Sequence, residues 1–442
     1  MFFIYGYGGT GKTHMRRTLT YALRSPKKIV LTVASSGIAS LLLPRGRTAH
    51  SKFKIQYQVL RTLFATYIKV PNLLAPMSHK FCFETLDKIL GDIMGTTTND
   101  SIIFGGKVVI FGGDFRQILP VIPRGCRSDI VHATINSSYL WHHCTILNLT
   151  KNMRLQNDDN TTEIREFLEW ILKVGDGKLS EPNDGCVEVN IPEELLILHF
   201  DNPIEAIVSS TYPDLHLHYN DEQFLQCRAI LASTIDIVYQ INEYVLSIIP
   251  GEEKEYLSSN SVDMSDVSDI EAVNILTLEF LNTLSTSDIP NHKIKLKVGT
   301  PIMLLRNLDQ PKRLCNGTRL VVTKMANHVL EAKIMSGKNV GHIIYIPRMS
   351  MSPSQTQFPF KLIRRQFRII ISYAMTINKS YGQSLESVGL YLPKPIFSHG
   401  QLYVAISRVK SKKGLKILID DKDGSPLKST TNVVYKEVFK KF

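Results

Sequence analysis

The residues that most directly indicate chemistry form a glycine-rich segment near the start of the chain. Gly6-Tyr7-Gly8-Gly9-Thr10-Gly11-Lys12-Thr13 follows the apolar run Phe2–Tyr5. It matches the phosphate-binding pattern G-x-x-x-x-G-K-[ST], which lies between a buried strand and a helix. Glycines let backbone N–H groups approach a phosphate without a Cβ in the way, and the helix start adds a positive dipole end. The alternative is a purely structural turn, but every specified position is present, so we predict a nucleoside triphosphate site.

Each position of this segment has an expected role. The Lys12 ammonium should reach the β- and γ-phosphates, and the Thr13 hydroxyl should ligate Mg²⁺. The remaining contacts to phosphate are expected from the backbone of the flexible positions, which are Gly6, Gly8, Gly9, Thr10 and Gly11.

Composition limits the class of protein. The chain has 442 residues, which suggests two to four domains at about 150 residues each, and 43% of it is hydrophobic. No apolar run reaches the ~18 residues that would indicate a membrane span. The net charge of +12 favours a polyanionic partner. The cysteines are scattered without C-x-x-C spacing, which predicts neither a zinc site nor a disulfide framework. A reducing compartment, the cytosol or the nucleus, is therefore expected. The cysteines are Cys82, Cys126, Cys144, Cys186, Cys227 and Cys315.

The first half of the chain alternates strand-like and helix-like patterns, which is typical of a parallel α/β sheet. Beyond Phe2–Tyr5, the expected strands are 28–33, 107–111 and 145–149. The expected helices are 12–23, one that begins within 34–39, 81–93 and 161–174. The last of these should place four side chains in the core, namely Phe167, Trp170, Ile171 and Val174.

The second half begins with another α/β pattern, a strand at 228–232 and a helix at 235–246. The polar, acidic stretch 251–290 has the composition of a surface excursion or flexible insert. Short β runs then predict a small inserted β-barrel; they are 293–298, 301–305, 319–323 and 341–346, with a turn at Asn316-Gly317. The run 367–372 is expected to return to the α/β sheet.

A basic stretch, Arg45–Lys54, follows the second strand–helix unit. Its mixture of basic, hydroxyl and aromatic residues suits phosphate contacts and base stacking along single-stranded nucleic acid. A solvated basic loop is an equal alternative on this stretch alone.

Five blocks of sequence stand in a characteristic order. They are Gly6–Thr13, Val33–Ser51, Gly112–Pro120, Leu149–Arg154, and the pair Thr376–Gln383 with Tyr403–Lys410. With the longer stretches 112–117, 290–293, 314–318 and 397–409, the chain resembles the superfamily-one 5′→3′ DNA helicases of the PIF (petite integration frequency) family over nearly its whole length. The subgroup carried by Helitron rolling-circle transposons is the most similar.

This resemblance implies an α/β fold of two RecA-like domains, with ATP between them and single-stranded DNA across both. We expect the first domain at 1–150, with 54–80 a degenerate wedge and Walker B region. The second domain is expected at 151–280 and 367–442, and the barrel at 281–366. ATP and Mg²⁺ are the implied cofactors, single-stranded DNA is the implied partner, no membrane is involved, and the nucleus is the expected location.

The resemblance also implies residue roles. Gln117 would sense the γ-phosphate and couple it to DNA, and Arg154 and Arg408 would act as arginine fingers. Without the other blocks, Ser407-Arg408 would more simply be a surface ion pair. The implied DNA contacts are Thr48, His50, Ser51, Thr376, Asn378, Lys379, Ser380 and Gln383.

The chain departs from the family pattern at several places. Leu73-Leu74-Ala75-Pro76-Met77 stands where the family has Asp-Glu-Ala-Pro-Met, so the carboxylates that hold Mg²⁺ and orient water are replaced by leucines. The segment 53–75 is short for the family, and Tyr381 stands where glutamine is usual. Because the chain opens on its central strand, we expect part of the N-terminus to be missing.

Three hypotheses follow from these departures. The protein is an ATP-dependent 5′→3′ DNA helicase, or a catalytically impaired remnant that binds ATP and single-stranded DNA, or the product of an exon junction misplaced between Phe53 and Ala75. Glu84 and Asp87 lie on one face of the predicted helix 81–93, but they are poor substitutes for the lost carboxylates. Asp114 is closer in principle but belongs to the turn that follows its strand.

Overall fold

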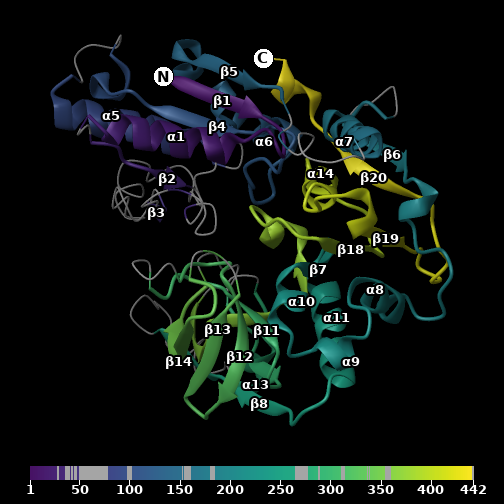
Figure 1. Cartoon of the computed structure of the whole chain (residues 1–442). Helices are drawn as coiled ribbons and strands as arrows, with labels where there is room; N and C mark the ends of the chain where they lie inside the picture. The colour runs from purple at the N-terminus through teal and green to yellow at the C-terminus, as the bar shows by residue number, and fades with distance from the viewer. Residues whose placement is uncertain are drawn as a thin grey trace. The chain divides into compact units, whose positions relative to one another are not determined.

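The computed structural model describes residues 1–26, 29–34, 40, 43, 47–48, 78–96, 102–151, 153, 161–179, 185–263, 277–286, 289–309, 314–335, 337, 339–353 and 360–440. The chain divides into two compact units, each considered by itself (Figure 1). The first unit comprises Met1–His199, Ser380–Glu386 and Leu390–Phe442. The second unit comprises Phe200–Lys379 and Ser387–Gly389. The domain limits expected from the sequence stay a prediction.

A three-stranded parallel sheet organises the first unit, with β1 (Phe2–Gly6) between β4 (Ile110–Gly113) and β5 (Thr145–Leu149). Ile4 lies opposite Gly112 on one side and Leu147 on the other. The carboxyl ends of parallel strands meet at one edge of a sheet, where ligands of α/β proteins bind. The segments that follow β1 and β4 therefore emerge side by side.

An aromatic core packs this sheet. The ring centroid of Phe3 lies 5.7 Å from that of Phe115 and 5.1 Å from that of Trp141. α1 (Lys12–Arg24) follows the glycine-rich segment, and α5 (Lys80–Met94) contributes Phe83 to the same core. Both helices agree with the expected ranges.

Two strand predictions in this region are partly wrong. The strand expected at 107–111 is observed at Ile110–Gly113, and Val108 is 75% exposed. The observed strand begins at Ile110 rather than at 107 because its partner β1 begins with Phe2, which lies opposite Ile110. Of the strand expected at 28–33, only Val33 is in a strand, β2 (Val33–Ala34), which pairs with β3 (Arg47–Thr48). Residues 29–32 form no strand, and residue 28 and the helix expected from 34–39 lie outside the described residues apart from Ala34.

The rest of the first unit comes from the middle and the end of the chain. α7 (Thr161–Asp176) contacts α14 (Gln401–Ile406), whose six residues are all buried. β6 (Cys186–Asn190) pairs antiparallel with β20 (Ser429–Val433). The core positions predicted on α7 are confirmed for Phe167, Ile171 and Val174, which are buried, whereas Trp170 is half-buried. The first unit also contains α6 (Arg127–His132), 3₁₀ turns and β19 (Leu415–Ile419), whereas β18 (Ser387–Leu392) is divided between the units, with Ser387–Gly389 in the second.

In the second unit, β7 (Arg228–Ala232) pairs in parallel with β17 (Ala374–Thr376). Around them lie α8 (Pro203–Thr211), α9 (Leu215–His218), α10 (Glu222–Gln226) and α11 (Ile235–Ile248). The expected strand 228–232 and helix 235–246 are confirmed.

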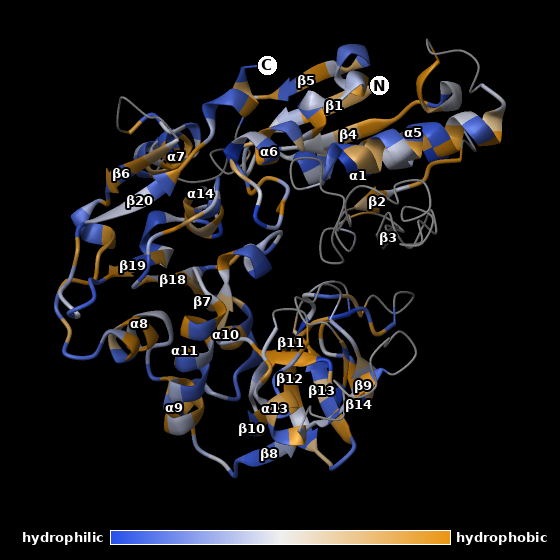
Figure 2. Ribbon diagram, turned by 180° about the vertical axis from the view of Figure 1, so that it is seen from behind, coloured by the Kyte–Doolittle hydropathy of each residue, from blue (hydrophilic) through white to orange (hydrophobic). Residues whose placement is uncertain are grey.

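The same unit contains the inserted β structure. Its larger sheet has the order β16-β11-β12-β13-β14-β15-β9 with antiparallel neighbours, and β8 pairs with β10. Its buried core residues are apolar, and all four residues of β11 are buried. Figure 2 shows β11 mostly in the hydrophobic colour. The strands are β8 (Lys254–Leu257), β9 (Ser259–Asp263), β10 (Lys293–Leu296), β11 (Pro301–Leu304), β12 (Arg319–Met325), β13 (Val329–Ile334), β14 (Ile343–Met351), β15 (Lys361–Phe367) and β16 (Ile369–Ile371).

Two expectations for this region are corrected. The stretch 251–290 is no mere surface excursion in its described part, because it supplies β8, β9 and α13 (Leu278–Thr283). The run 367–372 does not return to the α/β sheet, since β16 pairs with β11 and the later strand β17 joins β7. Residues 264–276 lie outside the described part of the chain.

The buried side chain of Arg364 explains how a polar stretch is held in place. Its Nε donates to Oδ1 of Asn260 at 2.8 Å. Its terminal nitrogens donate to the carbonyl oxygens of Leu281, Leu284 and Pro290 at 2.8–3.1 Å. One guanidinium therefore joins β9 and α13 to β15, which local composition does not reveal.

We predict that Arg364→Met loosens this segment. Three buried carbonyls and an amide oxygen lose a charged donor, which should lower the free energy of unfolding by about 2–4 kcal/mol. Amide hydrogen exchange over Leu278–Pro290 should accelerate. The matched control is Arg365→Met at the exposed neighbouring position; equal protection in the two variants would contradict the prediction.

Candidate nucleotide site

The glycine-rich segment adopts a loop that only small residues allow. Gly9 and Gly11 have φ of 92° and 76°, in the left-handed region that favours glycine. A Cβ on Gly11 would lie 2.4 Å from Sδ of Met153, and one on Gly6 would lie 2.5 Å from Oγ1 of Thr10. At Gly8 a Cβ would meet nothing within 4 Å, so the loop has open space beside it. The chain thus turns from β1 into α1 with its backbone available to a ligand.

Lys12, the first residue of α1, folds back over this loop. Its Nζ donates to the carbonyl oxygens of Gly6 and Tyr7, the latter at 2.9 Å. Burial lowers the pKa of Lys12 to about 8; Asp114 opposes this shift and nearby guanidinium groups, including Arg16, add to it. The ammonium therefore lies where an anionic ligand would stabilise its charge.

Asp114 anchors the loop that follows β4. Its carboxylate is fully buried, and Oδ2 accepts a hydrogen bond from the Tyr403 hydroxyl at 2.6 Å. Oδ1 accepts from the backbone N–H of Arg116 at 3.2 Å, and an Arg116 guanidinium nitrogen lies 3.5 Å away. Because both carboxylate oxygens are engaged by protein donors, Asp114 is poorly placed to serve as a water-activating base.

Tyr403 connects this loop to the glycine-rich segment. Its hydroxyl accepts a hydrogen bond from the Gly8 backbone N–H at 3.3 Å while it donates to Asp114. Arg116 continues the network, with Nε 2.6 Å from Asp176 and a terminal nitrogen 3.1 Å from the Tyr5 hydroxyl. The network joins β1, β4, α7 and α14 through buried polar contacts.

His399 and Gly400 hold the same loop from another side. The Nδ1 of His399 accepts from the Tyr435 N–H at 2.8 Å, so its Nε2 carries the proton and donates to the Phe115 carbonyl oxygen at 2.7 Å. Burial lowers the pKa of His399 to about 4, which keeps the ring neutral. A Cβ on Gly400 would lie 2.3 Å from the Arg116 carbonyl oxygen, so only glycine fits.

Gln117 and Arg408 belong to the first unit together with Lys12. The Tyr381 hydroxyl donates to Oε1 of Gln117, and the Arg408 guanidinium lies 5.9 Å from the Tyr381 ring centroid. Arg408 is 7% exposed; its Nε donates to the Val404 carbonyl oxygen at 2.8 Å. Its action as an arginine finger stays a prediction.

The structure brings together only part of the predicted site. Thr13 is the second residue of α1, and Ser380 and Gln383 fall in the first unit, where the Gln383 N–H donates to the Ser380 carbonyl oxygen at 3.0 Å. Thr376, Asn378 and Lys379 fall in the second unit, in β17 and the 3₁₀ turn Ile377–Ser380. Only the backbone of Thr48 is described. His50, Ser51, Arg154, Leu73, Leu74 and most of Arg45–Lys54 lie outside the described residues.

The carboxylates considered as substitutes are occupied elsewhere. Glu84 accepts a hydrogen bond from the Ser138 hydroxyl at 2.7 Å. Asp87 accepts from the Phe104 N–H and from the Tyr139 hydroxyl, the latter at 2.6 Å. Both therefore attach α5 to the segment that covers it. Within the described part of the chain, no three His, Cys, Asp or Glu side chains are grouped as metal ligands.

Tyr403, Tyr381 and His399 were assigned no role from the sequence. Tyr403 and His399 lie in the stretch 397–409 that carries the family resemblance, and Tyr381 was noted only as a departure from it. Tyr381, His399 and Tyr403 contact Gln117, Phe115 and Asp114, which lie 264–289 residues away along the chain, so no local pattern reveals these contacts.

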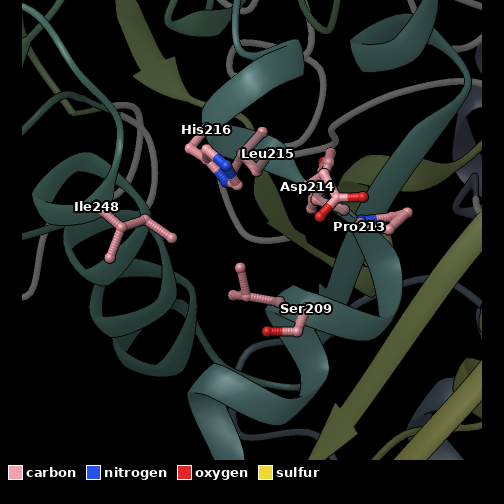
Figure 3. A pocket seen from close by; sticks show the side chains of 8 residues that line it. Ser209, Pro213, Asp214, Leu215, His216 and Ile248 are labelled. Atoms are coloured by element: carbon pink, nitrogen blue, oxygen red, sulfur yellow. The ribbon is translucent and has the colours of Figure 1, made fainter.

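A separate cavity of about 550 Å³ lies within the second unit between α8, α9 and α11 (Figure 3). Asp214 and His216 at its rim are exposed, and it contains no predicted site residue. Its lining is Val208, Ser209, Tyr212, Pro213, Asp214, Leu215, His216 and Ile248. We assign it no role.

Comparison with known proteins finds two family matches and several similar relatives. The family described as "PIF1-like helicase" matches residues 1–185, and "DNA helicase Pif1, 2B domain" matches residues 279–325. The ATP-dependent DNA helicase PIF1 of Xenopus laevis is 23% identical over 94% of this chain, which spans 58% of that relative's length. The ATP-dependent DNA helicase Pif1 of Bdellovibrio bacteriovorus is 25% identical, covering 94% of this chain and 83% of that protein.

A solved structure shows the same fold. Pif1 helicase from Bacteroides in complex with ADP-AlF3 and ssDNA aligns with a TM-score of 0.61 and 19% identity, covering 94% of this chain and 88% of that chain. The chain has the two RecA-like regions and the inserted β domain of this fold, as predicted. It belongs to the PIF1-like helicase family. Among the described residues, no helix has the length and apolar character needed to cross a membrane.

We predict that nucleotide binding takes up a proton at alkaline pH. The pKa of Lys12 is about 8 in the free protein and should rise beside phosphates. Well below pH 8 the ammonium is already charged, so affinity should not change with pH through this group. At pH 9, binding should take up close to one proton, and affinity should fall as pH rises further.

Titration calorimetry at pH 9, in two buffers with different ionisation heats, measures this uptake. Lys12→Arg provides the control, because a guanidinium stays charged at pH 9 and has no proton to take up. An uptake of the same size in Lys12→Arg would contradict the assignment to Lys12.

Proposed function

We propose that the protein is an ATP-dependent DNA helicase that couples ATP hydrolysis to 5′→3′ movement along single-stranded DNA, with Mg²⁺ as the cofactor metal. The observation that carries the proposal is the link between the phosphate-binding loop and the loop after β4. Tyr403 bridges Gly8 and Asp114, while Lys12, Gln117 and Arg408 belong to the same unit. Such a link would allow the state of the nucleotide to be transmitted to the rest of the unit.

The residues present fit a triphosphate. The loop has glycines with positive φ, open space beside Gly8 and a half-buried lysine whose pKa is lowered by burial. α1 is 13 residues long, so its N-terminus adds a dipole end at the same place. For Mg²⁺, the chain offers the Thr13 hydroxyl, and bound metal would neutralise charge on the phosphates.

A second candidate function rests on Leu73 and Leu74. Without the Asp-Glu pair, no carboxylate at these positions holds the metal's water shell or orients the attacking water. The protein would then bind ATP and single-stranded DNA with slow turnover. Any part in DNA repair, recombination, telomere maintenance or Helitron transposition, and a nuclear location, are extensions of the same proposal.

We predict salt-sensitive binding to single-stranded DNA. Five basic residues assigned to DNA from the sequence, Arg45, Arg47, Lys52, Lys54 and Lys379, would displace counterions. The plot of log affinity against log salt should have a slope of about −3 to −4. Fluorescence titration with a labelled oligonucleotide measures it.

Paired variants test the origin of this slope. Lys52→Ala with Lys54→Ala should make the slope shallower by about 1.4. Lys422→Ala, at an exposed position in a tight turn, should leave it unchanged. A flat salt dependence, or tighter binding to blunt duplex than to a single strand, would count against the DNA assignment.

We also predict that ATP turnover is slow and that carboxylates at positions 73 and 74 increase it. Leu73→Asp with Leu74→Glu should raise DNA-stimulated phosphate release by about 10²–10⁴-fold, the range of general-base assistance. The neutral, similarly shaped pair Leu73→Asn with Leu74→Gln should not. If the unsubstituted protein already turns over as fast as the carboxylate variant, another carboxylate serves, and the impaired-remnant reading is wrong.

A further inference from the structure

The backbone around Gln117 is held firmly. The Gln117 N–H donates to the Asp114 carbonyl oxygen at 3.1 Å, and the Asp114 side chain is fixed by Tyr403. Gly400 packs so closely that a Cβ there would lie 2.7 Å from the Gln117 carbonyl carbon. The remaining freedom at this position is therefore in the side chain, whose terminal amide rotates about a soft torsion.

Tyr381 restricts rotation of the terminal amide of Gln117. Its hydroxyl donates to Oε1 of Gln117, and its ring lies under the Arg408 guanidinium. Burial raises the pKa of Tyr381 to about 12, although Arg408 opposes the shift, so the phenol is neutral near pH 7 and keeps the proton that it donates. Tyrosine stands here where the family resemblance leads us to expect glutamine, which has no phenol to donate.

The hydrogen bond from Tyr381 determines which end of the Gln117 amide faces away from the phenol. A carboxamide has an acceptor oxygen and a donor NH₂ group at opposite corners. When the oxygen faces the phenol, the NH₂ group is directed elsewhere. An NH₂ group is the edge that binds an anion, whereas a flipped amide would present an oxygen and repel one.

Gln117 also lies on the correct edge of the sheet. It follows β4, which pairs in parallel with β1, and β1 leads directly into the phosphate-binding loop. Two hydrogen bonds, Gly8 to Tyr403 and Tyr403 to Asp114, connect that loop to the turn containing Gln117. The terminal phosphate of a nucleotide in the loop is the nearest anion that this turn would meet.

We infer that Tyr381 is a positioning residue that turns the Gln117 amide so that its NH₂ group donates to the terminal phosphate of bound ATP. The inference rests on the proposed function, because it requires the loop to bind ATP. Its consequence is specificity: ADP lacks the phosphate concerned, so Tyr381 favours ATP over ADP without contacting either nucleotide.

The test compares a non-hydrolysable ATP analogue with ADP, both with Mg²⁺, by equilibrium titration. Tyr381→Phe removes only the hydroxyl and keeps the ring beside Arg408. We expect it to weaken analogue binding about 3–10-fold, as for loss of a modest hydrogen bond, and to change ADP binding less than twofold. Tyr391→Phe is the control: it removes another buried phenol of the first unit, one that donates to Asp420 at 3.1 Å, and should change neither affinity.

A double-mutant cycle distinguishes positioning from packing. In a Gln117→Ala background, Tyr381→Phe should have no further effect on analogue binding, because no amide remains to orient. Gln117→Glu keeps an acceptor for the phenol but presents a negative oxygen, so it should lose the preference for the analogue even with Tyr381 intact. Thermal unfolding of each variant confirms that it is folded, and the Gln117→Glu comparison tests the inference even if Tyr381→Phe unfolds.

Three outcomes would overturn the inference. Tyr381→Phe could match the Tyr391→Phe control, or weaken the analogue and ADP equally, or retain its effect in the Gln117→Ala background. If the unsubstituted protein binds neither nucleotide, the proposed function fails and the inference fails with it. That result differs from the other three, in which both nucleotides still bind.

Discussion

The buried carboxylate of Asp114 is the constraint on which the first unit depends. A charged group removed from water is costly unless donors surround it, and removing one partner of a buried ion is more destabilising than replacing both. Here the donors are the Tyr403 hydroxyl and the Arg116 backbone and guanidinium, and Arg116 in turn pairs with Asp176. The residues that hydrogen-bond to this carboxylate, directly or through Arg116, thus connect α14 and α7 to the edge of the parallel sheet. The phosphate-binding loop joins the network because the Tyr403 oxygen has a lone pair left for Gly8.

Local patterns predicted the elements whose partners are near in sequence or whose periodicity is strong. α1, α5, α7, β5, β7 and α11 follow from apolar spacing and lie close to the expected ranges. β8 and β9 were not predicted, because their polar composition favours a loop and they pair with strands far along the chain. The guanidinium of Arg364 stabilises that arrangement by binding three backbone carbonyl oxygens and the Asn260 side chain, and a single arginine in a strand pattern gives no sign of it.

The same distinction applies to the site. Gly6–Thr13 can be recognised from the sequence because the residues of a phosphate-binding loop are consecutive and form one short motif. The contacts of Tyr403 with Asp114, of His399 with Phe115 and of Tyr381 with Gln117 span 264–289 residues, and each depends on how the fold returns to the first unit. Gly400 illustrates the limit: its need for glycine arises from the carbonyl of Arg116, which lies 284 positions earlier. Resemblance to a family supplies the position of such residues but not what they touch.

The basic groups of the site share a further property. Lys12 donates to the carbonyl oxygens of Gly6 and Tyr7, Arg16 donates to Gly112 at 2.7 Å, and Arg408 donates to Val404. The carbonyl oxygens that accept these hydrogen bonds carry no net charge, and the buried Asp114 is shared with Arg116. Burial is the main cause of the lowered pKa of Lys12, and the neighbouring guanidinium groups lower it further. A polyphosphate at the loop would give these cations charged partners in place of carbonyl oxygens, so the arrangement of the site favours an anion.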